Sequence, residues 1–262
     1  MNAPIHDWTN RRVWLLGAST GIGAALAQSL LRAGARVAVS ARSAGKLAAV
    51  VGAAGVTGCD ARRTLVLPCD ATDDAAVAAA TRQIVTAWGG IDVALYVAGD
   101  YVSMRAWELD LPRARHLVDI NLLGAFAFAA SVVPQLLAQE QGEIGFVASV
   151  AGYRGLPRSL VYGPTKAALI NFAEALALDL QPRGVGVRVI NPGFVATPLT
   201  AQNDFAMPAL QTPEEAAAAI LDGYRSRAFE IHFPKRFTRF MKLLALLPAR
   251  LYLPLIRRST GA

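Results

Sequence analysis

The sequence contains few of the residues on which disulfide frameworks and metal sites depend. Its 262 residues include two cysteines, Cys59 and Cys69, and three scattered histidines, with no paired metal-ligand spacing. This scarcity excludes a disulfide-stabilised scaffold, predicts no metal site and favours a reducing compartment. The first twelve residues lack the order of a signal peptide, and no run of eighteen apolar residues predicts a membrane span. We therefore expect a cytoplasmic protein.

Acidic residues are missing from one end of the chain. From Lys235 onward there are seven basic residues and no Asp or Glu, so the net charge of +7 belongs to this tail, and the remainder has 19 residues of each sign. A basic tail without a recognition fold does not predict nucleic-acid binding.

The rest of the chain alternates short apolar runs with longer Ala- and Leu-rich stretches of helical period. Because each connecting helix must pack back on the sheet, the pattern predicts an α/β fold: a single doubly wound Rossmann-type domain with a central parallel sheet and helices on both faces. A long helix is expected over about 112–139. We assign residues 1–234 to this domain and 235–262 to a basic amphipathic extension. The predicted strands lie within 12–17, 36–42, 64–70, 91–99, 143–149 and 186–193.

The first predicted strand runs into the glycine-rich turn GASTGIG, residues 17–23, and then into a helix. Glycines let the backbone approach a pyrophosphate, and the helix N-terminus offers free N–H groups. The spacing of Gly17, Gly21 and Gly23 differs from the common G-x-G-x-x-G, although the strand–turn–helix context favours a dinucleotide over a plain tight turn.

The second strand ends without the Asp or Glu that holds an NAD ribose, and Arg42 stands there instead. An arginine at this point suits a 2′-phosphate, so we expect NADP(H) as the preferred cofactor, with NAD(H) as the alternative. A solvated arginine at a strand end is the other interpretation.

Tyr162 and Lys166 are four residues apart at the start of a predicted helix and therefore share one face. This pair alone is weak evidence, since an ordinary helix start could contain it. Together with the other motifs and their order, the chain resembles the classical short-chain dehydrogenase/reductase family. The resemblance is carried by the glycine turn, Asp70 in LPCDATD, VAG at 97–99, Asn121 in DINLLG, Ser149 in VASVAG, Tyr162, Lys166, and NPGFVATP from Asn191.

The resemblance implies a catalytic tetrad of Asn121, Ser149, Tyr162 and Lys166. Ser149 would hold the substrate oxygen, and Tyr162 would give or take its proton. Lys166 would lower the tyrosine pKa, which is about 10 in a free phenol, and would also bind the nicotinamide ribose. Asn121 would position a water that links Lys166 to solvent. The implied cofactor-binding residues are Gly17, Ser19, Thr20, Gly21, Ile22, Gly23, Arg42, Asp70, Ala71, Ala98, Gly99, Tyr162, Lys166, Pro192, Gly193, Val195 and Thr197.

The sequence departs from the family pattern at Tyr96 and Val97, which replace two asparagines. This motif shapes the strand end and the ribose wall, so we expect altered cofactor affinity with the chemistry retained. Asp70 could alternatively cap the helix that begins near Thr72.

Substrate specificity is expected from the loop before Tyr162 and from residues 194–211, an apolar lid followed by a capping box, Thr212 to Glu215. These loops favour a hydrophobic ketone or secondary alcohol. Arg154 and Arg158 could meet an anionic group, although exposed arginines are more often solvated.

The extension places Phe237, Phe240, Met241, Leu244 and Leu247 on one helical stripe. A membrane surface, the same chain or a partner subunit could cover it, and peripheral membrane contact is one expectation. The family resemblance implies a homodimer or homotetramer. The main functional hypothesis is an oxidoreductase, and the alternative is a non-catalytic dinucleotide sensor or membrane-associated partner protein.

Overall fold

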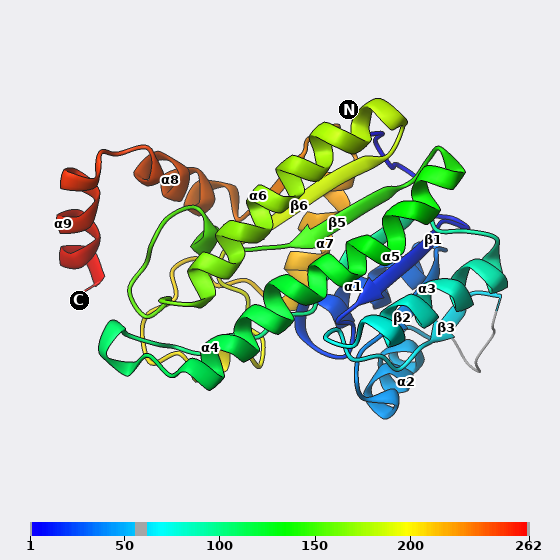
Figure 1. Ribbon diagram of the computed structural model, residues 1–262, viewed down its shortest axis with the longest axis horizontal. Helices are drawn as coiled ribbons and strands as arrows, with labels where there is room; N and C mark the ends of the chain where they lie inside the picture. The colour runs from blue at the N-terminus through cyan, green and yellow to red at the C-terminus, as the bar shows by residue number, and fades with distance from the viewer. Residues whose placement is uncertain (1, 56–61, 261–262) are drawn as a thin grey trace.

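The computed structural model describes residues 2–55 and 62–260. Within this part of the chain, seven strands form one parallel sheet in the order β3-β2-β1-β4-β5-β6-β7 (Figure 1). The strands are β1 Arg12–Leu16, β2 Arg36–Ser40, β3 Thr64–Val66, β4 Val93–Tyr96, β5 Glu143–Val147, β6 Gly186–Pro192 and β7 Glu230–Phe233. The strand order reverses between β1 and β4, which is where doubly wound sheets bind ligands.

Helices cover both faces of the sheet, as the alternating pattern predicts. The helices are α1 Gly21–Arg32, α2 Ala44–Ala53, α3 Asp74–Trp88, α4 Leu111–Val118, α5 Gly124–Gln139, α6 Tyr162–Leu180, α7 Pro213–Tyr224, α8 Lys235–Ala245 and α9 Ala249–Thr260. The predicted α/β fold class is therefore confirmed.

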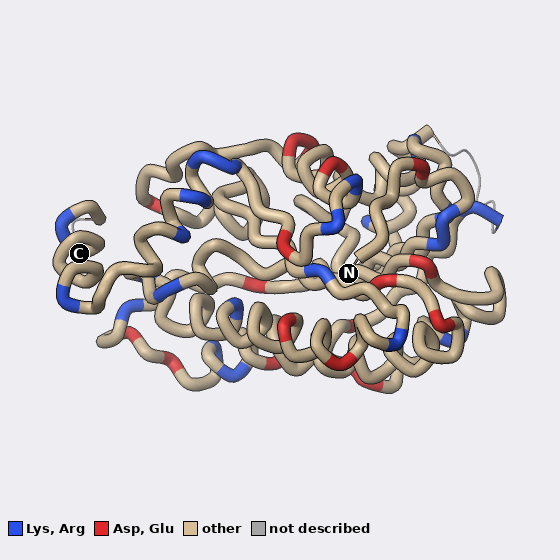
Figure 2. The backbone as a smooth tube through the Cα atoms, turned by 90° about the horizontal axis from the view of Figure 1, so that it is seen from above, with Lys and Arg blue, Asp and Glu red and all other residues tan. Residues whose placement is uncertain are grey.

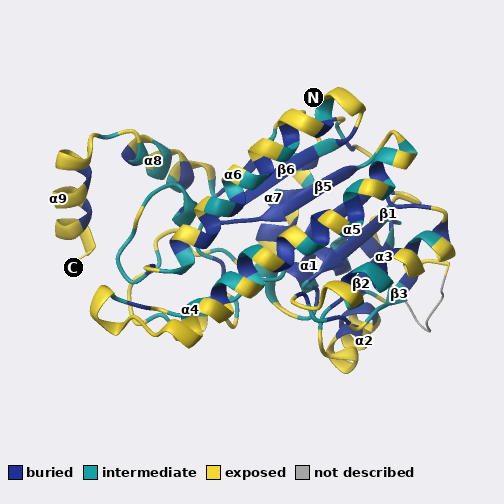
Figure 3. Cartoon of the chain, in the orientation of Figure 1, coloured by how far each residue is buried: buried dark blue, intermediate teal, exposed yellow. Residues whose placement is uncertain are grey.

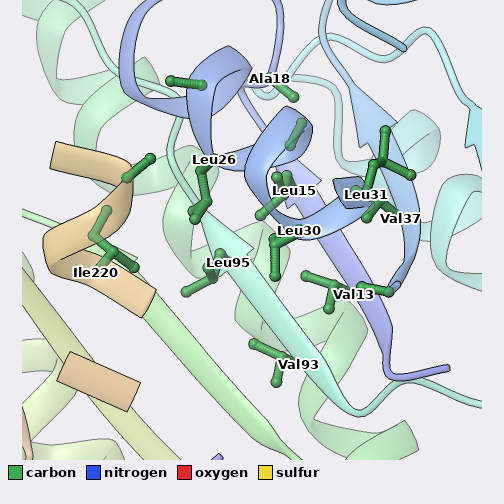
Figure 4. Close-up of a cluster of buried hydrophobic side chains, with 14 of the residues drawn as sticks. Val13, Leu15, Ala18, Leu26, Leu30, Leu31, Val37, Val93, Leu95 and Ile220 are labelled. Atoms are coloured by element: carbon green, nitrogen blue, oxygen red, sulfur yellow. The ribbon is translucent and has the colours of Figure 1, made fainter. Parts of the chain in front are cut away.

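Successive side chains of each strand point to opposite faces, so two hydrophobic cores flank the sheet. One core joins Leu15 and Leu95 to α1 and α7, with Leu26 and Ile220 between them (Figure 4). The other joins Trp14 to α3, α5 and α6. Because both faces are covered, the strands are almost wholly buried and the helices expose only their outer sides (Figure 3).

The helical stretch expected over 112–139 is present and contains a π-helical turn. The α4 and α5 helices are joined by a π-helical turn, Asp119–Leu123, which contains the buried Asn121. By length and composition the run Leu111–Gln139 could cross a membrane. Its side chains Phe128 and Val132 are instead fully buried against the sheet, as in a core helix.

The predicted capping box is present at the start of α7. Thr212 Oγ1 accepts from Glu215 N at 3.1 Å, and Glu215 Oε2 accepts from Thr212 N at 2.8 Å. After β7 the chain leaves the sheet, and α8 and α9 extend at one end of the molecule (Figure 1).

Candidate functional site

A cavity of about 890 Å³ lies at the carboxyl ends of the strands. Among the described residues it extends from the glycine turn after β1, past the start of α6, to α8 and α9. Asn121 lies outside the lining, although its neighbour Ile120 belongs to it. The predicted site residues that line the cavity are Gly17, Ser19, Thr20, Gly21, Ile22, Gly23, Arg42, Asp70, Ala71, Ala98, Gly99, Ser149, Tyr162, Lys166, Pro192, Gly193, Val195 and Thr197.

The turn between β1 and α1 leaves a backbone cradle that only glycines permit. Gly17 has φ +104°, and a Cβ on it would lie 2.3 Å from the Ala98 backbone N. A Cβ on Gly23 would lie 2.1 Å from the Gly17 carbonyl oxygen. The Thr20 side chain makes no capping bond to α1, so first-turn N–H groups remain for an anion. This arrangement fits the pyrophosphate of a dinucleotide.

The adenosine end of the cavity is cationic. Arg42 follows β2 at the cavity wall, and Lys46, in the first turn of α2, lines the same wall. Sequence reasoning missed Lys46, and its place four residues after Arg42 could have indicated it. Ser43 caps α2 by accepting from Lys46 N at 3.4 Å. Both side chains bring positive charge to this wall of the cavity.

Asp70 does not cap a helix. Its Oδ1 accepts from Thr72 N at 3.0 Å and from Thr72 Oγ1 at 2.8 Å, and Asp73 caps α3 instead through Ala76 N. The alternative interpretation of Asp70 is therefore wrong. The bonds from Thr72 are the main cause that holds the pKa of Asp70 below its usual range, and nearby Arg42 adds to it.

The catalytic end brings Ser149, Tyr162 and Lys166 together at the cavity wall. Burial raises the pKa of Tyr162 to about 12, although a hydrogen bond from Ser149 acts in the opposite direction. Burial also lowers the pKa of Lys166 to about 8. Lys166 Nζ donates to the Val147 carbonyl at 2.9 Å and lies 5.6 Å from the Tyr162 ring centroid. Desolvation outweighs the opposing hydrogen bond in setting the pKa of Tyr162, and Lys166 is directed at a carbonyl.

Asn121 holds the backbone beside the catalytic residues. Its Oδ1 accepts from Asp100 N at 2.9 Å, and its Nδ2 donates to the Asp100 carbonyl at 2.9 Å and to Thr165 Oγ1 at 3.2 Å. The π-helical turn brings this side chain to the loop after β4. Next in that loop, Tyr101 packs its ring edge against Tyr162 at 5.1 Å between centroids.

Only one of the two residues that replace the family's asparagines reaches the cavity. Val97 lines it. Tyr96 is fully buried beside Phe128, and its hydroxyl donates to the Ile120 carbonyl at 2.5 Å, in the π-helical turn. Tyr96 is the last residue of β4, and its side chain points away from the cavity into the α5 layer.

The predicted substrate loops do border the cavity. Asp204 of the lid forms an ion pair with Arg158, in the loop before Tyr162. Gln202 Nε2 of the lid donates to the Tyr101 carbonyl at 2.7 Å, in the loop after β4. The lid therefore contacts both of these loops. Arg154 donates to the carbonyls of Ala245, at 2.9 Å, and Leu247. Arg154 therefore binds the C-terminal end of α8, and Arg158 binds a carboxylate of the lid. Both guanidinium groups thus have partners within this chain.

The amphipathic stripe of the extension is partly covered by its own chain. Met241, Leu244 and Leu247 pack with Tyr252 and Ile256 of α9 and with Leu156. The residues of both helices that line the cavity are Phe237, Phe240, Met241, Leu244 and Ile256. The amphipathic pattern predicts that the apolar stripe is covered, but such a pattern does not identify the surface that covers it.

A glycine cradle, a cationic end and a Ser, Tyr and Lys group at one cavity on a doubly wound sheet define a dinucleotide-dependent oxidoreductase. A sequence profile described as short chain dehydrogenase matches residues 11–207. The chain belongs to the short-chain dehydrogenase/reductase family.

Individual relatives agree with this assignment. The chain is 33% identical to an uncharacterized oxidoreductase of Myxococcus xanthus over 255 residues, covering 96% of this chain and 98% of that one. It is 29% identical to the ketoacyl reductase HetN of Nostoc over 227 residues, covering 85% and 78%. A short-chain type dehydrogenase/reductase from Mycobacterium marinum superimposes with a TM-score of 0.75 at 27% identity, covering 86% of this chain and 94% of that structure.

Proposed function

We propose that this protein is an NADP(H)-dependent oxidoreductase that acts on a carbonyl or secondary alcohol, with a hydrophobic substrate. The observation that carries the proposal is the meeting of Ser149, Tyr162 and Lys166 at the wall of the cavity that also contains the glycine cradle. The cofactor, when bound, supplies or accepts the hydride.

The residues of this chain would do the remaining work. Ser149 would hold the substrate oxygen by a hydrogen bond. Tyr162, whose pKa burial raises to about 12, would give its proton to a carbonyl oxygen being reduced or take one from an alcohol being oxidised. Lys166, with a pKa of about 8, is mostly cationic at pH 7 and would stabilise the tyrosinate that results.

The preference for NADP(H) rests on Arg42 and Lys46, which line the cavity after β2 where an NAD site would carry an acid. A titration that follows nicotinamide fluorescence would compare NADPH and NADH. Since a charged hydrogen bond contributes about 1.5–3 kcal/mol, Arg42→Ala and Lys46→Ala should each weaken NADPH binding by roughly 10- to 150-fold and leave NADH binding unchanged. Arg82→Ala, an exposed arginine on α3, is the control. Equal affinity for both cofactors in the wild type would contradict the assignment.

The hydrophobic substrate rests on the lining beyond Tyr162, where Leu156, Phe205, Met241 and Leu244 surround the cavity. A relative named as a ketoacyl reductase is consistent with a carbonyl on an apolar chain.

Three further expectations belong to the same proposal. Residues 1–234 act as the dinucleotide-binding and catalytic domain, and 235–262 as its extension. The protein assembles as a homodimer or homotetramer. It works in the cytoplasm, with the extension in peripheral contact with a membrane. The alternative of a non-catalytic sensor is disfavoured by the presence of all four tetrad residues.

A further inference from the structure

The two C-terminal helices have one face turned to the cavity and one turned outward. On the inner face, Met241, Leu244 and Ile256 line the cavity. Leu244, Tyr252 and Ile256 form a small core of their own, with Leu156 packed against them. The helices are therefore a structural wall of the substrate end and not a loose tail.

Polar contacts fix this wall to the catalytic loops. The guanidinium of Arg154 stacks on the Tyr252 ring at 4.1 Å, and the Tyr252 hydroxyl donates to the Gly155 carbonyl at 2.7 Å. Lys242 of α8 pairs with Glu230 of β7, which also accepts from Tyr153 at 2.5 Å. The loop that follows Ser149 is thus joined directly to α8 and α9.

The outer face combines exposed leucines with cations. Leu246 is 81% exposed, Leu243 65% and Leu253 63%. Both helices are largely exposed on this side (Figure 3), and the end of the molecule that α9 forms carries basic residues and no acidic ones (Figure 2). The exposed apolar residues are Phe240, Leu243, Leu246, Leu251, Leu253 and Leu255, and the exposed basic residues are Lys235, Arg236, Arg239, Arg250, Arg257 and Arg258.

The cavity reaches the surface at this same place. Phe240 lines the cavity and is also 56% exposed. Ser259 and Thr260, at the end of α9, line it too and are exposed. A ligand that enters past these residues passes the apolar side chains of α8 before it reaches Tyr162.

We propose that the outer face of α8 and α9 docks on an anionic lipid bilayer, and that the cavity takes its substrate from that bilayer. The substrate class is a ketone or secondary alcohol on a long apolar chain, dissolved in the membrane. The substrate part of this inference rests on the oxidoreductase function proposed above.

The charge pattern selects a bilayer over a second copy of the chain. An isologous contact through α8 and α9 would bring two clusters of cations together without a carboxylate between them, because residues 235–262 contain no Asp or Glu. Interleaved leucines and cations instead match an interface of acyl chains and anionic headgroups.

Vesicle flotation of the full-length protein tests the docking. Vesicles of phosphatidylcholine alone are compared with vesicles that also contain phosphatidylglycerol. Since each cation near an anionic surface contributes about a fivefold gain in binding, Arg257→Gln with Arg258→Gln should weaken binding to the anionic vesicles by roughly 25- to 30-fold. Arg82→Gln with Arg183→Gln removes the same charge from exposed sites elsewhere and should have little effect.

The apolar part is tested by Leu246→Ser with Leu253→Ser, which should abolish flotation. Leu178→Ser on α6, which is 79% exposed, is the control and should float as the wild type does. Equal flotation with neutral and anionic vesicles would overturn the proposal. So would sedimentation in which the Leu246 and Leu253 variant dissociates an oligomer of the wild type, because a second copy would then cover this face.

Entry of a membrane-dissolved substrate into the cavity is tested with a pyrene-labelled long-chain methyl ketone dissolved in the anionic vesicles. Transfer to the protein should lower pyrene excimer emission. Met241→Trp, which narrows the cavity, should block this transfer while flotation continues, and transfer that is unaffected would refute the route. NADPH binding, followed by fluorescence in solution, is independent of all these results. Its absence would remove the oxidoreductase proposal and leave the docking result standing.

Discussion

Replacing Tyr96 by phenylalanine removes one hydroxyl and keeps the ring that packs on Phe128. In the wild type this hydroxyl donates to the Ile120 carbonyl at 2.5 Å, over the position where Gly124 leaves room for it. The variant leaves a partly buried carbonyl without its donor, which costs about 1–3 kcal/mol. For a chain of this size, each kcal/mol lowers Tm by about 2–4 °C, so Tm should fall by roughly 2–12 °C.

Cofactor binding, in contrast to Tm, should hardly change in Tyr96→Phe. Because the Tyr96 side chain is buried in the α5 layer and only Val97 lines the cavity, Tyr96→Phe should leave the Kd of NADPH within about twofold. Val97→Asn, which restores the family's amide at the cavity wall, should change that Kd with little loss of Tm. Thermal unfolding and fluorescence titration measure the two effects. An unchanged Tm in Tyr96→Phe would contradict the stabilising role of the hydrogen bond to the Ile120 carbonyl. A large loss of NADPH affinity would contradict the position of Tyr96 away from the cavity.

Three other predictions concern the cradle, the wall and the buried lysine. Gly23→Ala should lower the free energy of unfolding by at least about 1–3 kcal/mol, because its Cβ would meet the Gly17 carbonyl oxygen. The control is Gly52→Ala in α2, which has open space around it and should raise the free energy of unfolding by about 0.4–1 kcal/mol. Denaturant titrations measure both changes. Arg154→Ala should accelerate amide hydrogen exchange at the C-terminal end of α8 by roughly 10- to 150-fold, since it loses charged hydrogen bonds to the carbonyls of Ala245 and Leu247. Unchanged exchange there would contradict its anchoring role. The pKa of Lys166 is lowered from 10.5 to about 8 by burial, so the unfolded state binds more protons between these values and stability contributed by this group should rise as pH increases from 8 to 10.5. Lys166→Met should remove that rise, by about 3 kcal/mol at most, in unfolding curves measured across this range.

The sheet and the cofactor cradle could be predicted because they depend on local patterns. The apolar strand before Gly17 and the helical period after Gly23 fix a turn that presents backbone N–H groups, whatever surrounds it. Tyr162 and Lys166 share a helix face for the same local reason.

Contacts between distant segments could not be read from the pattern. Tyr96 and Ile120 are separated by a loop and a helix, and nothing near Tyr96 in the sequence indicates that its hydroxyl meets a π-helical turn. Arg154 similarly finds its partners at the end of α8, more than ninety residues away. The tyrosine pKa depends on how completely the walls desolvate the phenol, which is a property of the assembled cavity.

In the function proposed for this protein, Tyr162 is the proton donor of an NADP(H)-dependent oxidoreductase. The measurement compares the turnover of the wild type and of Tyr162→Phe with NADPH and a panel of aliphatic and aryl ketones. An NADPH titration of both proteins accompanies it. Turnover should fall by at least about 10²-fold, with the Kd of NADPH nearly unchanged. Turnover that persists in the variant, or a wild type that binds NADPH and reduces no ketone of the panel, would contradict it.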